Sequence, residues 1–280
     1  MGVIDDIKKN AKRTGAKIQG SEATRLEKIL NATFYLDKNI DEEVKFLRQV
    51  MTRGADTQER VGLHASALIA NPKDYCIRKQ VLSLLYKQAQ GEEISVGLKR
   101  IFEEGNAIHE KWQRLFIRAG YSKAEDLDFT RFNERYLISF TPDIVCRIPA
   151  FCDEQMVGEI KSVNTYQFQK MGKHPSAWKQ LQFYMYLTGI HKGFVLCDDK
   201  NTQDFKLEVY DYDKEIVAPF VDRAEEIRYH YSRVLDEGKM VKRPKHAKDP
   251  TCRLCETCAM RDACWNIGMG RVRIDNGAWE

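Results

Sequence analysis

The chain has 280 residues, and its 45 Lys and Arg against 41 Asp and Glu give a formal net charge of +4. Hydrophobic residues make up 43% of it and charged residues 31%, which indicates a globular protein with a sizeable core and excludes a low-complexity chain. No apolar run approaches the length of a membrane-spanning helix, and the small net charge means that any nucleic-acid binding must depend on local basic clusters.

The first sixty residues predict a helical extension. Residues 1–20 are basic and poorly periodic, so we expect this stretch to be frayed or disordered. Ser21 is placed to cap one helix, and the acidic run 41–43 opens a second. Residues 54–57 have the composition of a linker.

Two more helices are expected before any strand, from about Cys76 to Gln88 and from Arg100 to Ala119. In the second, apolar residues recur at steps of three and four. His109 lies at the edge of this apolar stripe, above Gly105, where a small residue permits close approach. A lone histidine in such a place is more often a packed or surface group than a ligand, so the helix alone assigns it no role.

A cluster of strands follows. Residues 136–140 and 144–148 predict two strands that are broken at Asp143, and residues 155–161 predict a third. Because side chains alternate along a strand, Glu159 and Lys161 point the same way, and the residue between them points into the core. Two carboxylates and an ammonium can bind Mg²⁺, activate water and stabilise phosphate charge. The same short pattern also occurs as a turn followed by a solvated ion pair.

The next helix spans residues 178–187 and carries Gln180 and Tyr184 one turn apart on one face. Gln182 and Tyr186 have the same spacing, so geometry does not choose between the pairs. The apolar residues 194–197 lead to Lys200, and an exposed lysine is usually just solvated. A long amphipathic helix is expected from Asp213 to Asp236. Basic surfaces are expected at residues 8–13 and 239–248.

Half of the cysteines lie together near the C-terminus. Cys252, Cys255, Cys258 and Cys264 follow the spacing C-x2-C-x2-C-x5-C, whereas Cys146, Cys152 and Cys197 lie in apolar or strand-like stretches and are expected in the core. The first residues are charged and lack the apolar segment of a signal peptide. Clustered thiols without an export signal favour a metal or iron–sulfur site over disulfides.

Taken with Cys76, these motifs resemble the RecB-type PD-(D/E)xK nucleases, specifically their iron–sulfur branch. That group includes the CRISPR-adaptation exonuclease, nuclease subunits of bacterial double-strand-break repair, and phage single-domain relatives. The resemblance covers about Leu63 to Trp265. It implies an α/β, restriction-endonuclease-like core, in which helices flank a mixed central sheet. The expected parts are an N-terminal helical extension at 1–60, the nuclease core at 61–250 and a cysteine-cluster segment with tail at 251–280.

The resemblance also implies roles for individual residues. Mg²⁺ or Mn²⁺ would be held by the following groups: His109, Asp143, Glu159 and the main-chain carbonyl of Ile160. Lys161 would orient or activate the attacking water. Gln180, Tyr184 and Lys200 would contact DNA near the catalytic groups. A 4Fe–4S cluster would be bound by four cysteines: Cys76, Cys255, Cys258 and Cys264. Cys252 is then one thiol too many, and a local site made of the four tail cysteines, holding zinc, is the alternative.

The expected activity is that of a metal-dependent DNA nuclease, preferably an exonuclease on single strands or duplex ends in recombination, repair or phage DNA processing. A structure-specific endonuclease and a non-catalytic DNA-binding adaptor are the alternatives, although an adaptor has no reason to keep Asp143, Glu159 and Lys161 together. The chain lacks helicase motifs, so a helicase or a recombination or adaptation protein is an expected partner besides DNA. We expect a cytoplasmic protein of a bacterial or phage-infected cell, without a membrane partner.

Overall fold

The computed structural model describes residues 20–33, 39–53, 62–86, 95–127, 130–170 and 175–265. Residues 1–19 of the expected frayed segment at 1–20, the linker at 54–57, Gln88 and the basic surface at 8–13 lie outside these ranges. The chain divides into two compact units. The first comprises 1–59, 97–131 and 140–218, and the second comprises 60–96, 132–139 and 219–280. The three segments expected from the sequence, with boundaries at 60 and 250, stay a prediction.

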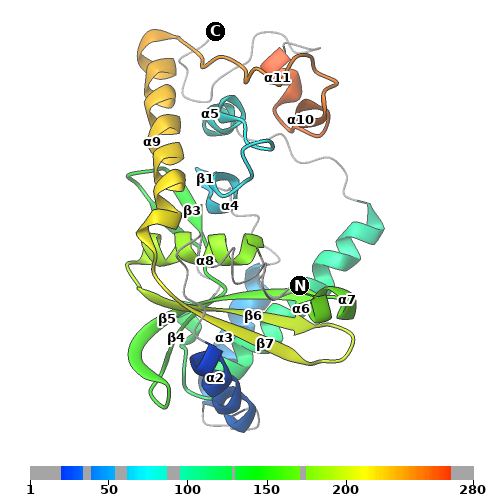
Figure 1. Cartoon of the computed structure of the whole chain (residues 1–280), viewed down its shortest axis with the longest axis vertical. Coiled ribbons are helices and arrows are strands. Elements are labelled where there is room, and N and C mark those ends of the chain that lie inside the picture. Colours follow the sequence, from blue (N-terminus) through cyan, green and yellow to red (C-terminus); the bar gives the residue numbers. More distant parts are fainter. Residues whose placement is uncertain are drawn as a thin grey trace, which may run out of the picture. The chain divides into compact units, whose positions relative to one another are not determined.

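A mixed four-stranded sheet forms the centre of the first unit (Figure 1). Its strands, in spatial order, are β4 (Ile144–Ile148), β5 (Cys152–Val163), β6 (Lys192–Asp199) and β7 (Phe205–Asp211). The β5 and β6 strands run parallel, and the two outer pairs are antiparallel. Ile144 is paired with Gly158, so β5 continues for several residues past the point where β4 begins.

Helices cover both faces of this sheet (Figure 1). One face packs against a group of elements that share the main core: α2 (Gly20–Thr33), α3 (Ile40–Arg53), α6 (Val96–Arg118) and the short 3-10 helix η1 (Ala124–Asp126). Ile160 of β5 belongs to this core together with Trp112 and Phe116 of α6. The other face packs against α8 (Pro175–Thr188), whose Leu181 lies close to Gly193 of β6. The α/β class with a mixed sheet flanked by helices is therefore confirmed.

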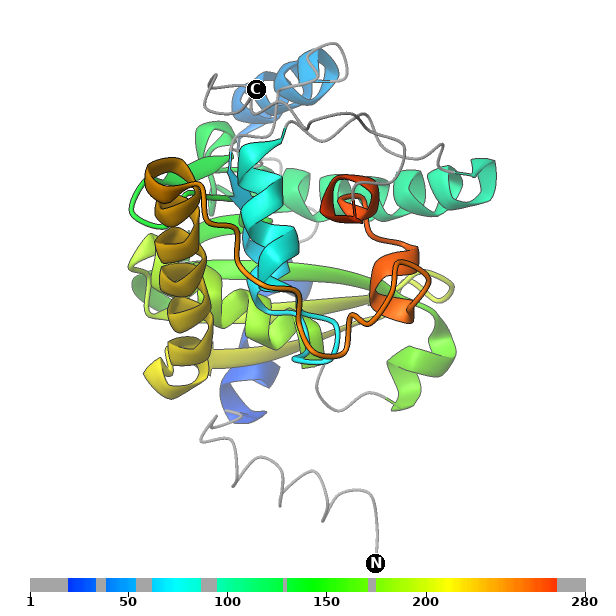
Figure 2. The same cartoon turned by 90° about the horizontal axis from the view of Figure 1, so that it is seen from above.

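The second unit contains a small sheet of order β1-β3-β2, formed by β1 (Leu63–His64), β3 (Ile138–Phe140) and β2 (Arg131–Asn133). Its helices are α4 (Ala65–Leu68), α5 (Ile77–Leu85), α9 (Lys214–Glu237), α10 (Arg253–Glu256) and α11 (Arg261–Trp265). Both views show that the segment after α9 passes α5 on its way to α10 and α11 (Figures 1 and 2). Arg78 of α5 fixes this segment by donating a 2.5 Å hydrogen bond to the carbonyl of Val241.

The turn between β2 and β3 differs from the prediction that a strand begins at Tyr136. Asn133 Oδ1 accepts a 3.1 Å hydrogen bond from the Tyr136 amide, and Leu137 has φ of 55°, so the strand begins only at Ile138. Leu137 O also accepts a 2.8 Å bond from Leu63 N. A Cβ on Gly62 would lie 2.4 Å from that oxygen, which explains a glycine there.

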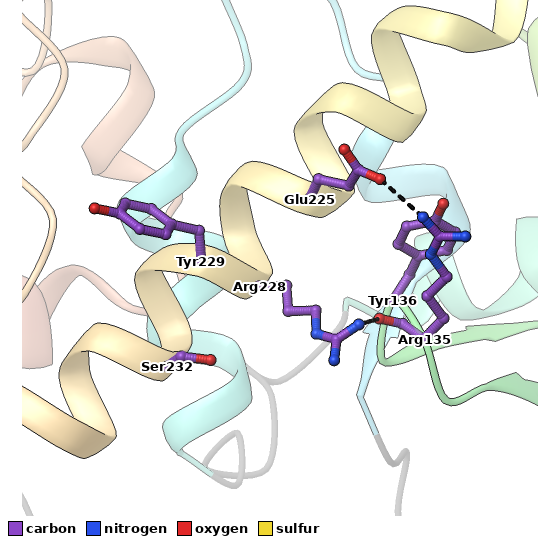
Figure 3. A pocket seen from close by; sticks show the side chains of 6 residues that line it. All are labelled: Arg135, Tyr136, Glu225, Arg228, Tyr229 and Ser232. Atoms are coloured by element: carbon purple, nitrogen blue, oxygen red, sulfur yellow. Dashed lines mark hydrogen bonds and ion pairs between the residues drawn. The ribbon is translucent and has the colours of Figure 1, made fainter.

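Helix α9 holds the same turn through charged side chains (Figure 3). Arg228 donates a 2.8 Å hydrogen bond to the carbonyl of Arg135, and the Arg135 guanidinium forms a 3.2 Å ion pair with Glu225. These residues, with Tyr136, Tyr229 and Ser232, line a hollow of about 340 Å³. Both guanidinium groups are already engaged in contacts that hold the turn against α9, so we assign this hollow a structural role.

Helix boundaries agree with the sequence in most places. Residues 178–187 lie within α8, and the expected helix 213–236 is α9. The predicted cap at Ser21 is wrong, because α2 begins at Gly20 and Ser21 lies inside its first turn. None of the described helices is long and apolar enough to cross a membrane.

Candidate active site

Asp143 directly precedes β4, and its carboxylate completes the edge of β5. The Ile160 amide donates a 2.8 Å hydrogen bond to Asp143 Oδ2. Since Ile144 pairs with Gly158, Ile160 lies just beyond the region that β4 covers, and the carboxylate takes the place of a strand carbonyl. One carboxylate oxygen is thereby fixed beside the strand that carries Glu159.

His109 faces the other oxygen of the same carboxylate. Its Nδ1 lies 3.2 Å from Asp143 Oδ1. Burial disfavours the charged imidazole, but the hydrogen bond and charge of Asp143 outweigh burial and raise the pKa of His109 above its usual value. Helix α6 thus brings His109 beside the carboxylate of Asp143, and its role as a metal ligand stays a prediction.

Gln113, one helical turn after His109, holds the main chain of Asp143. Its Nε2 donates a 2.8 Å hydrogen bond to the Asp143 carbonyl, and its side chain is buried. The sequence reasoning missed this residue. The i, i+4 spacing from His109 was the available signal, because such residues share one helix face.

Glu159 is completely buried on the sheet face that packs against α8. Lys161 Nζ lies 2.5 Å from its Oε1 as an ion pair, yet neither carboxylate oxygen accepts a well-formed hydrogen bond from a described residue. Burial, and then the charge of Asp143, raise the pKa of Glu159 to about 8. For Lys161, burial acts to lower the pKa, but the two carboxylates outweigh it and raise the pKa.

The kinds of side chain at this site, though not their spacing in the structure, suit a divalent cation of the Mg²⁺ or Mn²⁺ kind. An imidazole nitrogen and two carboxylates are suitable ligands, and both buried oxygens of Glu159 lack a well-formed hydrogen bond from a described residue. Within the described residues, no group of three or more His, Cys, Asp or Glu side chains is close enough to hold a metal ion. Ile160 gives its amide to Asp143 and its side chain to the core, so the role of its carbonyl stays a prediction.

The two Gln/Tyr pairs of α8 have different surroundings. Gln180 Nε2 donates a 3.0 Å hydrogen bond to the hydroxyl of Tyr184, which is buried and whose pKa is raised by burial and by Glu159. Gln182 instead joins main-chain groups, donating to Asp211 O at 2.9 Å and accepting from Asp213 N at 2.8 Å. The geometry therefore favours the first pair as part of the site and gives Gln182 a structural task.

Lys200 lies in the turn after β6. Its amide donates to Val163 O at 3.0 Å, at the end of β5, and its Nζ lies 3.4 Å from Glu104 of α6. The turn therefore places this ammonium group beside α6 and beside the end of the strand that carries Glu159. Its contact with DNA stays a prediction.

The cysteines of the second unit approach one another from α5, α10 and α11. Cys76 is the N-cap residue of α5, and α5 packs against α11, which carries Cys264. Burial raises the pKa of Cys76, and the neighbouring Cys264 and Cys258 raise it further. Arg78 Nε donates a 3.2 Å hydrogen bond to Cys264 Sγ.

The fifth thiol lies beside the same group. Burial and a hydrogen bond with Cys252 raise the pKa of Cys255 to about 11, and Cys258 adds to this rise. Cys252 is the half-buried N-cap residue of α10, and a hydrogen bond with Cys255 outweighs burial and lowers its pKa. All eight cysteines lie in the described part of the chain, and none forms a disulfide. Of the three cysteines expected in the core, Cys146 is fully buried, and the other two are half-buried.

Several solved exonuclease structures resemble this chain. Two structures of an alkaline exonuclease from Laribacter hongkongensis, one of them with dAMP, match 61% of this chain and 88% of their own, at 16% identity and TM-scores of 0.40 and 0.45. A phage-related exonuclease from Haemophilus somnus matches 64% of this chain and 96% of its own, at 16% identity and a TM-score of 0.42. No protein-family model matches the sequence, and no curated protein matches it. At this level of similarity the roles of residues rest on the site itself.

Proposed function

We propose that this protein is a Mg²⁺- or Mn²⁺-dependent deoxyribonuclease, acting as an exonuclease on single-stranded DNA or duplex ends. The observation that carries the proposal is the state of Glu159. This carboxylate is fully buried, has no well-formed hydrogen bond from a described residue, and lies beside Asp143 and His109. Burying one carboxylate beside a second that repels it is costly unless a cation compensates them. A structural ion pair would not need the second acid.

In this proposal His109, Asp143, Glu159 and the carbonyl of Ile160 hold the divalent ion. When bound, the ion lowers the pKa of water and neutralises charge on the scissile phosphate. Lys161, whose ammonium is kept charged by its raised pKa, donates a hydrogen bond to the attacking water or to a phosphate oxygen. Gln180 orients the Tyr184 hydroxyl toward the strand being cut, and attack proceeds in line with the leaving oxygen.

We also propose that Cys76, Cys255, Cys258 and Cys264 bind a 4Fe–4S cluster that joins α5 to the C-terminal segment. Four thiols without a histidine suit iron–sulfur or zinc, and a hydrogen bond from Arg78 to Cys264 Sγ stabilises thiolate charge at that position. Such a cluster adds folding free energy, because the unfolded chain has no preformed site. The same arrangement leaves Cys252 outside the ligand set.

The function is tested by incubating end-labelled linear DNA and circular single-stranded DNA with the purified protein and Mn²⁺ or Mg²⁺. An exonuclease degrades the linear substrate and spares the circle. Cleavage of both would indicate the endonuclease alternative, and binding without cleavage would indicate the adaptor. Glu159→Gln, prepared in parallel, controls for contaminating nuclease. Adding a helicase or recombination protein then tests whether a partner is needed to open duplex ends.

A further inference from the structure

The apolar stripe of α6 continues past the point where the helix leaves the core. From Ile108 onward the stripe is buried under the sheet. The preceding turns carry Leu98, Ile101 and Phe102, which are 42%, 58% and 51% exposed. Contiguous large apolar side chains on an exposed helix face usually mark a surface that is covered in function, and this stretch of α6 has that character.

This stretch and His109 share one helix face. Phe102 precedes His109 by seven residues, nearly two full turns, so the two side chains point in almost the same direction about 10 Å apart along the axis. That distance corresponds to about three stacked base steps in DNA. A strand whose phosphate lies at His109 and Asp143 therefore has bases within reach of Phe102.

Gly105 lies between them on the same face. A Cβ at this position would meet only the Ser162 hydroxyl, at 3.9 Å, which is ordinary contact. Glycine inside a helix is unfavourable relative to alanine, and no packing of the described residues requires it here. The bare backbone at Gly105 therefore leaves room beside the candidate site for a ligand that approaches the helix closely.

We propose that Leu98, Ile101 and Phe102, together with the bare backbone at Gly105, form a surface on which unpaired bases of the substrate strand stack next to the scissile phosphate. We call this surface the α6 stripe. Stacking on an aromatic ring tolerates every base, which suits a nuclease without sequence preference. Lys200, whose Nζ lies 3.4 Å from Glu104 of α6, supplies a cation for the backbone on the flank of the stripe. The inference rests on the proposed nuclease function.

Binding of fluorescent oligothymidylate to the full chain, measured by anisotropy with Ca²⁺ in place of Mn²⁺, tests the stripe. Phe102→Ala should weaken binding by about tenfold, and Phe102→Trp should restore it, because the loss is that of one stacked base. Met51→Ala, which removes an exposed apolar side chain from α3, should bind like the wild type. With an oligonucleotide that lacks its bases, the Phe102→Ala and wild-type affinities should converge.

Gly105 provides an independent variant that does not weaken the fold. Gly105→Gln should raise the melting temperature, because it replaces glycine inside a helix, and should weaken oligonucleotide binding because its side chain fills the open space. Wild-type affinity in both Phe102→Ala and Gly105→Gln would overturn the inference. So would a change of molecular mass in Phe102→Ala, measured by light scattering, since it would show that the stripe covers a second copy.

Failure of the proposed function is recognised separately. Hydrolysis of the nitrophenyl ester of thymidine 5′-phosphate by the wild-type protein needs the candidate metal site but no base at the α6 stripe. If this ester and DNA both remain uncleaved while Phe102→Ala still weakens oligonucleotide binding, the nuclease proposal is wrong and the stacking surface stands. If the ester is cleaved and both variants bind oligonucleotide like the wild type, the nuclease proposal stands and the stacking surface is wrong.

Discussion

Gln113 donates a 2.8 Å hydrogen bond to the main-chain carbonyl of Asp143, while His109, one turn earlier on α6, lies 3.2 Å from the carboxylate of the same residue. Helix α6 therefore contacts Asp143 at both its main-chain carbonyl and its side-chain carboxylate. The distance between the helix and the sheet edge is fixed by a residue that has no role as a ligand.

Gln113→Ala should remove the hydrogen bond to the Asp143 carbonyl and so weaken the attachment of α6 to Asp143. The variant leaves a buried carbonyl unpaired, which costs about 1–3 kcal/mol of stability. The Mn²⁺ concentration for half-maximal activity should rise about 10- to 100-fold, as expected when a group that orients a ligand is lost. Both are measured by thermal melting and by metal titration of nuclease activity. An unchanged metal requirement with a lowered melting temperature would mean that Gln113 is only a packing residue.

The raised pKa of Glu159 predicts that stability depends on pH. The pKa moves from 4.5 to about 8 on folding, so the folded, metal-free protein binds more protons than the unfolded chain between these values. Its free energy of unfolding should therefore fall as pH rises through that window, by on the order of 4 kcal/mol if Glu159 acts alone. Thermal melting from pH 5 to pH 8.5 in EDTA measures the effect.

Glu159→Gln should abolish cleavage, keep DNA binding and melt with less dependence on pH. Glu154→Gln, which changes an exposed acid on the same strand, should behave like the wild type. Added Mn²⁺ should reverse the trend in the wild-type protein only, because metal binds the deprotonated carboxylate. A Glu159→Gln melting curve with the wild-type pH dependence would refute the assignment of the buried charge.

Protonation of His109 should make the nuclease activity fall at low pH. Asp143 holds the pKa of His109 above 6.5, and a protonated Nδ1 cannot bind metal. Activity should therefore fall as pH drops through this raised pKa, and higher Mn²⁺ should move the fall to lower pH. His109→Ala should raise the metal requirement by at least about tenfold, whereas His230→Ala on α9 should not. If His109→Ala titrates with metal like the wild type, His109 is a packed helix residue.

The cysteines separate two kinds of metal site. Anaerobically purified protein should be brown and contain about four irons with sulfide per chain. Cys76→Ser and Cys258→Ser should lose the colour and melt at lower temperature, while Cys252→Ser should keep both. One zinc per chain, with Cys252 essential and Cys76 dispensable, would instead establish a local site made of the four tail cysteines. Elemental analysis and visible absorption decide between them.

The strand that carries Glu159 and Lys161 was easier to predict from the sequence than the neighbouring strand and the side chains that hold the site in place. The alternation around Glu159 and Lys161 indicated a strand with Ile160 in the core, and β5 has that form. The alternation from Phe205 to Asp211 was equally regular, yet β7 was not predicted, because the turn that joins it to its antiparallel partner β6 lacks the glycine that usually marks a hairpin.

The hydrogen-bond partners of individual side chains could not be predicted from the sequence either. Spacing alone does not distinguish Gln180 from Gln182, since both have a tyrosine one turn later. Their roles separate only when α8 is placed against the sheet, where Gln182 meets the main chain of Asp211 and Gln180 meets Tyr184. Gln113 was hidden for the same reason, because its partner is a main-chain carbonyl thirty residues away.

The bond between Ile160 and Asp143 also bears on how the protein avoids self-association. Beyond Gly158, β5 has no paired β4 residue on one side, and an uncovered strand edge is a template for a strand of another molecule. The carboxylate of Asp143 accepts a hydrogen bond from the Ile160 amide, which lies just beyond the residues paired with β4, and places a negative charge there. The substitution Asp143→Ala removes both this charged cover of the strand edge and the candidate ligand. Its loss of activity should therefore be accompanied by a tendency to aggregate that Glu159→Gln does not share.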